Sequence, residues 1–292
     1  MIKRAVYKKS YLPYLLVLPQ LIITVVFFFL PAAEAIRGAF YRQDVFGLHQ
    51  HFVWFDNFKE LFESDIYLYS FGASFIFAFL VTVLSIGFAL LMAVLVNRVL
   101  VNSAYKTLLI WPYAVAPAIA GVLWRFLFDP SVGSISWMLH QMGYNWNFLL
   151  NGKQAMFLVV IAASWQQFSY NFIFFLAGLA AIPKSLIEAS AIDGAGPFRR
   201  FWTVVFPLLS PTTFFLLSIN LIYAFFQTFG VIATVTEGGP ANATNILVYK
   251  VYYDAFYGLN IGSSNAQSVI LMGIVLILTV IQFKYIERKV HY

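Results

Sequence analysis

The stretch from residue 183 to 211 reads PKSLIEASAIDGAGPFRRFWTVVFPLLSP and places charged and small residues between two long apolar segments. Pro183 suits the start of a helix, the residues after it are good helix formers, and Gly194 suits a left-handed helix end. Pro197 then falls near the first turn of a second helix. The apolar residues of that second helix are spaced to form one stripe, which consists of Phe198, Phe201, Trp202 and Val205. The stretch therefore predicts two short helices joined by a tight turn over residues 183–205.

The charged residues of this hairpin are expected to point away from its apolar stripe. Arg199 and Arg200 should be directed elsewhere, and Glu188 and Asp193 should project toward the cytoplasm or a partner. On the first helix two faces follow from the helical repeat, one with Leu186, Ser190 and Asp193 and the other with Ile187, Ala191 and Ala195. The same pattern fits an amphipathic hairpin lying in a membrane interface with its Arg side chains reaching toward water. From the residues alone both interpretations stay open.

Composition indicates a membrane protein with several spans. Hydrophobic residues make up 61% of the chain and charged residues only 10%, against about 25% charged residues in an average soluble domain. The apolar residues form uninterrupted runs of about twenty or more, which is the length needed to cross a hydrocarbon core. The net charge of +6 is scattered between these runs, which favours membrane topology over nucleic-acid binding. The absence of Cys excludes disulfides and thiolate metal sites.

Six hydrophobic segments predict six transmembrane helices, after a cytoplasmic N-terminal segment at 1–10. Their approximate ranges are 11–36, 66–96, 105–128, 155–182, 206–235 and 266–286. Kinks are expected near Pro13, Pro19, Pro112 and Pro117. With the N-terminus inside, the cytoplasmic side carries two thirds of the 18 Lys and Arg residues, which meets the positive-inside rule. These residues are Lys3, Arg4, Lys8, Lys9, Arg98, Lys106, Lys184, Arg199, Arg200, Lys284, Arg288 and Lys289. Both termini are therefore expected in the cytoplasm. The first segment also resembles a signal peptide, but its apolar run exceeds the usual core of about 7–15 residues, which favours an uncleaved span.

Polar residues within the predicted spans are candidates for a translocation path, because such residues usually face a bundle interior or a water-filled cavity. Two groups stand out: Gln167, Tyr170 and Asn171 in the fourth span, and Asn220, Tyr223 and Gln227 on one face of the fifth. The alternative for each is a hydrogen bond between helices that only holds the bundle together. Arg125 could attract an anionic substrate, but an ion pair with Asp129, four residues on, is the expected role.

Part of the quoted stretch, EASAIDGAGPFRRFWTVVFPLLSP, resembles the EAA signature of the permease subunits of binding-protein-dependent ATP-binding-cassette (ABC) importers. The residues that match in order and spacing are Glu188, Ala189, Asp193, Gly194, Ala195 and Pro207. Ser190 replaces the second Ala of the signature, and Phe206 stands where Leu is usual. Further stretches such as WPYAVAPAIAGVLWRFLFDP and EGGP extend the resemblance to the sugar-permease group over the whole length.

The resemblance implies an all-α membrane protein of the MetI-like type, with six helices and a cytoplasmic coupling hairpin. In that family the hairpin inserts into a groove of the ATP-binding subunit, so Glu188 would face the ATPase, Gly194 would make the turn, and Ala189 and Ala195 would allow close approach. The implied partners are a second homologous permease subunit in a heterodimer, two ATP-binding subunits, an extracytoplasmic substrate-binding protein and the lipid bilayer. The implied location is the cell inner membrane, and the implied substrate is sn-glycerol-3-phosphate or a glycerophosphodiester, with another sugar or polyol as the alternative.

Other functional classes find little support in the residues. No phosphate-cradling G-x-x-x-x-G-K sequence occurs, so ATP and Mg²⁺ are expected on partner subunits and no cofactor is expected in this chain. The four His residues fall in predicted loops or at the terminus, and neither a G-x-S-x-G elbow nor an H-E-x-x-H helix is present, so no enzymatic activity or metal site is predicted. An ion-coupled secondary transporter would be expected to carry coupling carboxylates within its spans. A membrane scaffold without a pore is the third alternative.

Overall fold

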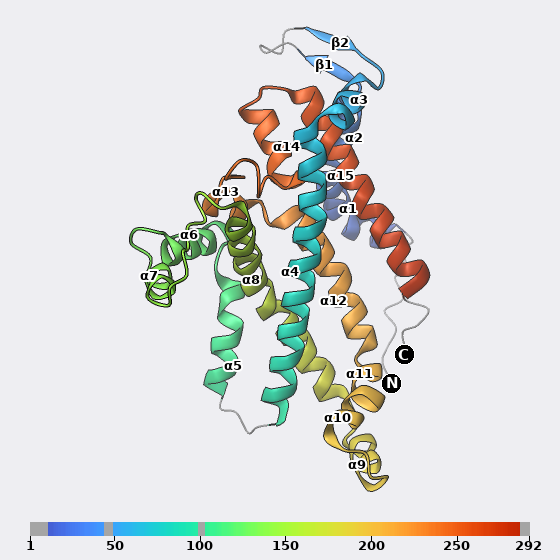
Figure 1. Cartoon of the computed structure of the whole chain (residues 1–292). Coiled ribbons are helices and arrows are strands. Elements are labelled where there is room, and N and C mark those ends of the chain that lie inside the picture. Colours follow the sequence, from blue (N-terminus) through green and yellow to red (C-terminus); the bar gives the residue numbers. More distant parts are fainter. Residues whose placement is uncertain (1–10, 44–48, 99–102, 287–292) are drawn as a thin grey trace. The chain divides into compact units, whose positions relative to one another are not determined.

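The computed structural model describes residues 11–43, 49–98 and 103–286. The predicted N-terminal segment 1–10 lies outside these residues, as do Lys3, Arg4, Lys8, Lys9, Arg288 and Lys289 of the predicted cytoplasmic charges and His291. The chain divides into two compact units, residues 1–63 with 254–270 and residues 64–253 with 271–292. Helices dominate both units (Figure 1).

The first unit holds a long apolar helix and a small hairpin of strands. Its elements are α1 Leu12–Thr24, η1 Val25–Phe29, α2 Leu30–Gly38, β1 Tyr41–Gln43, β2 Gln50–Phe52 and α3 Asp56–Glu63, together with the end of α14 Leu247–Phe256 and the first half of α15 Ile261–Ile281. The strands pair antiparallel with Tyr41 opposite Phe52. Asn57 stabilises the turn between α2 and β1, because its Nδ2 donates to the backbone oxygens of Ala39 at 2.8 Å and Tyr41 at 3.0 Å. These strands were not predicted from the sequence.

The second unit contains the longest helices and the main core. Its elements are α4 Asp65–Arg98, α5 Ser103–Ile110, η2 Trp111–Ala114, α6 Pro117–Phe128, α7 Ser134–Gln141, α8 Gly152–Ala181, α9 Lys184–Ile192, α10 Pro197–Arg200, η3 Phe201–Val205, α11 Phe206–Leu208, α12 Ser210–Ile222, η4 Tyr223–Gln227, α13 Phe229–Val235, the start of α14, the end of α15 and η5 Gln282–Ile286. Helix α8 lies at the centre and packs along α4 (Figure 1). Its most apolar window is 67% buried, against 28% for α4. Phe168, Phe172, Phe175 and Leu179 of α8 form the core with Leu209 and Leu216.

In the part of the chain that the structure describes, four helices are long and apolar enough to cross a membrane, and the number rises to six if each of two bent pairs is one span. The straight candidates are Pro13–Gly38, Asp65–Asn97, Gly152–Ala181 and Ile261–Lys284. They correspond to the first, second, fourth and sixth predicted segments.

The third and fifth predicted segments are bent. Helices 106–114 and 117–128 meet at 107°, because Val115 and Ala116 are extended before Pro117 and a residue that precedes proline avoids the helical region. The segments Pro197–Leu208 and Ser210–Gln227 meet at 68°. The fifth predicted segment also fails to reach residue 235 as one helix, because α13 starts anew after Thr228. The bend of the third segment confirms the kinks predicted near Pro112 and Pro117, whereas the bend of the fifth segment was not predicted.

Candidate functional site

The hairpin predicted over 183–205 is present, and its turn is local in origin. Helix α9 ends at Ile192, and Gly194 has a φ of 78°. The Ala195 N–H donates to the Ser190 oxygen at 3.0 Å, and the Gly194 N–H donates to the Ala191 oxygen at 3.1 Å. This pair of bonds is the Schellman motif, which satisfies carbonyls at a helix end and favours glycine at the left-handed position. The left-handed turn predicted at Gly194 is confirmed.

The hairpin has two limbs, of which α9 is the first and α10 with η3 is the second. The signature residues of the first limb lie mostly on the surface of this chain. Glu188, Ala189, Asp193 and Gly194 are exposed, whereas Ser190 and Ala195 are half-buried. The Ser190 hydroxyl is not available on the outer face, because it donates to the Ile187 oxygen at 2.8 Å. Pro207, the last signature residue, is half-buried in α11. The limb therefore presents two carboxylates and a small residue outward, as the sequence predicted.

The second limb, α10 with η3, carries the predicted apolar residues at different degrees of exposure. Phe198 is 78% exposed and Trp202 is 49% exposed, whereas Phe201 and Val205 are half-buried. Ring contacts join the exposed aromatic residues, with centroids 6.3 Å apart for Phe198 and Trp202. Ring contacts also join Phe201 to Trp202, with centroids 5.1 Å apart, and a single stripe of all four residues stays a prediction. An exposed apolar residue carries no penalty where lipid or a partner covers it, so hydrophobicity could not tell which side faces the bundle.

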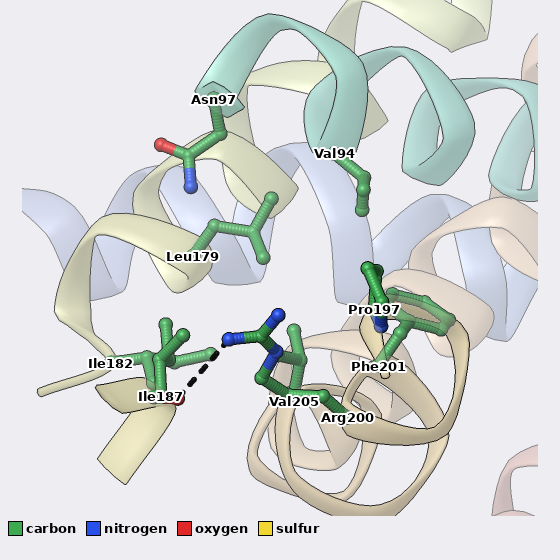
Figure 2. A pocket seen from close by; sticks show the side chains of 9 residues that line it. All are labelled: Val94, Asn97, Leu179, Ile182, Ile187, Pro197, Arg200, Phe201 and Val205. Carbon is green, nitrogen blue, oxygen red and sulfur yellow. Dashed lines mark hydrogen bonds between the residues drawn. The ribbon is translucent and has the colours of Figure 1, made fainter. Parts of the chain in front are cut away.

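Arg200 differs from the prediction that both arginines point away from the apolar stripe of the second limb. Its side chain is half-buried, and its Nη1 donates to the backbone oxygen of Ile187 at 3.3 Å, whereas Arg199 is exposed. Figure 2 shows the Arg200 guanidinium directed into a cavity of about 350 Å³ between the hairpin and the ends of α4 and α8. The remaining lining residues are Val94, Asn97, Leu179, Ile182, Pro197, Phe201 and Val205.

Two of the predicted path residues form a buried polar cluster between three helices. Asn171 of α8 and Asn220 of α12 are both 0% exposed. Asn220 Nδ2 donates to Asn171 Oδ1 at 2.7 Å, and Asn171 Nδ2 donates to Asn220 Oδ1 at 3.1 Å. The Ser85 hydroxyl of α4 also donates to Asn220 Oδ1, at 2.7 Å. These contacts agree with the alternative of hydrogen bonds between helices, and neither amide faces open space in this chain.

The other four candidates lie in different surroundings. Tyr223 is buried, and its hydroxyl donates to the Ala163 oxygen at 3.2 Å. Gln167 is 4% exposed, and its Nε2 has no hydrogen-bond partner among the described residues. Tyr170 is half-buried and Gln227 is exposed. Tyr223 and Gln227 are the first and last residues of the π-helical turn η4, and the difference in their burial was not predicted from the helical repeat. Contact with a transported solute stays a prediction for all six residues.

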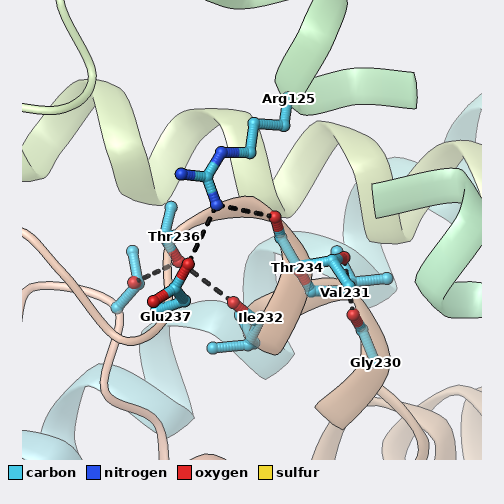
Figure 3. Close-up of polar contacts among 8 residues, drawn as sticks. Arg125, Gly230, Val231, Ile232, Thr234, Thr236 and Glu237 are labelled. Carbon is cyan, nitrogen blue, oxygen red and sulfur yellow. Dashed lines mark hydrogen bonds and ion pairs between the residues drawn. The ribbon is translucent and has the colours of Figure 1, made fainter. Parts of the chain in front are cut away.

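Arg125 pairs with a residue distant in sequence and not with Asp129. Its Nη1 donates to Glu237 Oε1 at 3.0 Å and to the Thr234 oxygen at 3.2 Å (Figure 3). Asp129 instead accepts the N–H groups of Ser131 at 2.8 Å and Val132 at 3.2 Å. The expected pair is therefore wrong, because Asp129 stands just beyond the end of α6, where its carboxylate caps the following turn.

Sequence reasoning missed three residues that organise these sites. Ser85 and Arg200 were not singled out for contacts, and Gln166 was passed over although its Nε2 donates to the Val115 oxygen at 2.7 Å at the bend of the third segment. A glutamine within an apolar segment could have drawn attention to Gln166. Among the described residues, no group of three His, Cys, Asp or Glu could hold a metal ion.

Comparison with known proteins places this geometry in context. The profile of the family described as "Binding-protein-dependent transport system inner membrane component" matches residues 85–292. The chain is 57% identical over 291 residues to the sn-glycerol-3-phosphate transport system permease protein UgpA of Rhizobium meliloti (strain 1021), which covers 99% of each chain. It is also 57% identical over 284 residues to the protein of the same name from Yersinia pestis, covering 97% of this chain and 96% of that one.

Solved structures show the same fold at low sequence identity. A bacterial ABC transporter involved in the import of the acidic polysaccharide alginate contains a chain that superposes with a TM-score of 0.80 at 21% identity. The match covers 95% of this chain and 97% of the other. A second structure of an alginate ABC transporter, in complex with a periplasmic protein bound to an alginate pentasaccharide, gives a TM-score of 0.80 at 20% identity. The predicted fold class is confirmed.

Proposed function

We propose that this chain, which belongs to the family of binding-protein-dependent transport system inner membrane components, is the permease subunit of an ABC importer for sn-glycerol-3-phosphate. It is a transport permease and not an enzyme. The substrate is supported by relatives that are 56–57% identical over nearly the whole chain and carry that substrate in their names. The runner-up is a permease of the same family for another sugar or polyol.

The hairpin of α9 and α10 is the observation that carries the proposed mechanism. It extends beyond the ends of α4 and α8 (Figure 1) and exposes Glu188 and Asp193. A short exposed helix with outward carboxylates and a left-handed glycine turn is suited to insertion into a groove of another subunit. We assign that groove to an ATP-binding subunit, which would hold the ATP and Mg²⁺.

The remaining parts of the assembly follow from this role. A second homologous permease would complete the pathway, two ATP-binding subunits would dock on the cytoplasmic hairpins, and an extracytoplasmic binding protein would deliver the substrate. The chain is an inner membrane component, and the distribution of Lys and Arg supports cytoplasmic termini and a cytoplasmic hairpin. Closure of the ATPase dimer would move the hairpin and rock the attached helices, which would alternate access to the pathway.

The substitution Glu188→Lys tests this proposal in the complete transporter reconstituted in vesicles. Reversal of the charge on the exposed face of α9 should abolish ATP-driven uptake of labelled glycerol-3-phosphate, because it places a like or unmatched charge in the docking contact. Membrane insertion should stay intact, since the Glu188 side chain is exposed.

The matched control is Glu63→Lys, a charge reversal at another exposed carboxylate in the other unit, and it should leave uptake unchanged. Normal uptake by the Glu188→Lys variant would refute the docking role. Uptake by the unaltered complex without ATP would instead favour a secondary transporter. Competition by unlabelled maltose as strong as that by unlabelled glycerol-3-phosphate would overturn the proposed substrate.

A further inference from the structure

Arg200 occupies an unusual position for an arginine at the end of a short surface helix. Its side chain is half-buried and is directed toward the first limb of the hairpin, while its neighbour Arg199 is exposed (Figure 2). The chain changes from α-helical to π-helical geometry immediately after Arg200, at Phe201. Arg200 therefore lies at the end of α10, where the chain continues through η3 and α11 to α12.

The Arg200 guanidinium bonds the two limbs to each other. Nη1 donates to the backbone oxygen of Ile187, which lies in the middle of α9, at 3.3 Å. Among the described residues, this is the one side-chain hydrogen bond that joins the limbs away from their connecting turn. Hydrogen bonds from charged donors are stronger than those between neutral groups, and partial exclusion of water strengthens them further.

The hairpin borders a cavity of about 350 Å³, which Arg200, Ile187 and Val205 line together with residues at the ends of α4 and α8. Ile187 and Val205 also pack against the core cluster that contains Leu179 and Leu209. Apolar contacts therefore hold each limb against the bundle, whereas the Arg200 hydrogen bond joins the limbs directly to each other.

We propose that Arg200 is a positioning residue that fastens the two limbs into one rigid unit, so that a displacement of α9 reaches α12 without being absorbed between the limbs. This inference rests on the proposed function, because it assumes that α9 is the limb on which the ATPase acts. In a complex without this bond the ATPase cycles while the limbs move independently, and less substrate is carried for each ATP hydrolysed.

The first test measures the distance between the limbs directly. The chain contains no Cys, so Lys184→Cys and Thr203→Cys, at two exposed positions, give its only labelling sites when it is assembled with cysteine-free partners. Pulsed electron paramagnetic resonance of a spin-label pair should give a narrow distance distribution in the parent complex. Arg200→Met keeps the apolar stem but removes the donor, and should raise the population of separated limbs about tenfold.

Two further variants distinguish the effect of the Arg200 hydrogen bond from the effects of side-chain charge and packing. Arg199→Met removes a neighbouring charge and should leave the distribution narrow. Arg200→Lys keeps a charged donor and should restore most of the narrow population. The inference is overturned if Arg200→Met matches Arg199→Met, or if Arg200→Lys is as broad as Arg200→Met. If Arg200→Met does not assemble, the comparison of Arg200→Lys with the parent complex decides: a narrow distribution supports the bond and a broad one overturns it.

The second test measures substrate transported per ATP hydrolysed by the same complexes. Arg200→Met should lower this ratio several-fold while ATP hydrolysis continues, and Arg199→Met should not change it; an unchanged ratio in Arg200→Met overturns the inference. Failure of the proposed function and failure of the inference on Arg200 give different results. Loss of ATP-dependent uptake in the unaltered complex would refute the proposed function, whereas the limb distances report on Arg200 without any transport.

Discussion

Replacement of Asn220 by leucine should destabilise the bundle more than any other single change at the predicted path residues. Three hydrogen bonds with other side chains converge on this amide, from Ser85, from Asn171 and to Asn171, and its Nδ2 also donates to the backbone oxygen of Leu216 at 2.7 Å. Hydrogen bonds between membrane helices contribute on average about 0.6 kcal/mol each. The three bonds together give about 2 kcal/mol, and the buried polar groups left without partners raise the expected loss to about 2 to 4 kcal/mol.

A double-mutant cycle tests whether the two amides act as one unit. Asn171→Leu removes two of the bonds and should cost about 1 to 2 kcal/mol. The double variant Asn171→Leu with Asn220→Leu removes both amides together, and the Ser85 hydroxyl keeps the Thr82 oxygen at 3.4 Å as an acceptor, so it should be no less stable than Asn220→Leu alone. The expected coupling energy is about 1 to 2 kcal/mol.

The assay is the free energy of unfolding of the purified chain in mixed micelles, titrated with sodium dodecyl sulfate and followed by far-ultraviolet circular dichroism. Gln227→Leu is the control, because Gln227 is polar but exposed, and its effect should stay within about 0.5 kcal/mol. Additive losses in the double variant would refute the reasoning, since independent sites show no coupling. A loss at Gln227 equal to that at Asn220 would refute it as well.

Two further predictions use glycines with matched controls. Gly194→Ala should cost about 1 kcal/mol of unfolding free energy at the left-handed turn and should accelerate amide hydrogen exchange in the last turn of α9 by roughly fivefold. Gly196→Ala is the control and should have neither effect, because φ there is −62°. Equal exchange in both variants would contradict the role of the turn. Gly121→Val should lower the free energy of unfolding by about 2 kcal/mol, because a Cβ there overlaps the Thr234 hydroxyl, while Gly87→Val meets open space. A neutral Gly121→Val in the same detergent titration would show that α6 and α13 can separate without cost.

Local sequence features predicted the hairpin turn and the straight spans well, because both depend on neighbouring residues. Gly194 ends α9 through bonds that reach back only a few positions, and a continuous apolar run is itself the requirement for a straight span. The bend before Pro117 also depends on neighbouring residues, because a residue that precedes proline avoids the helical region. The kinks expected near Pro112 and Pro117 are confirmed by this bend.

Contacts between distant residues could not be predicted in the same way. Arg125 has an acidic residue one turn away, yet it pairs with Glu237, 112 positions along the chain. Asn171 and Asn220 are 49 positions apart and bond to each other. Each residue was noticed for its chemistry, but its partner depended on how the helices pack.

The sequence by itself therefore determined the class of the protein, the approximate spans and the outward carboxylates of the hairpin, since these follow from apolar length, charge and helix-end chemistry. Only the tertiary structure decided which side of the second limb packs inward, and it placed Arg200 there with Phe201 and left Phe198 exposed. The physical reason is that a membrane protein does not have to bury apolar side chains away from its surroundings. Helix packing and hydrogen bonding, and not hydrophobicity, then select the buried face.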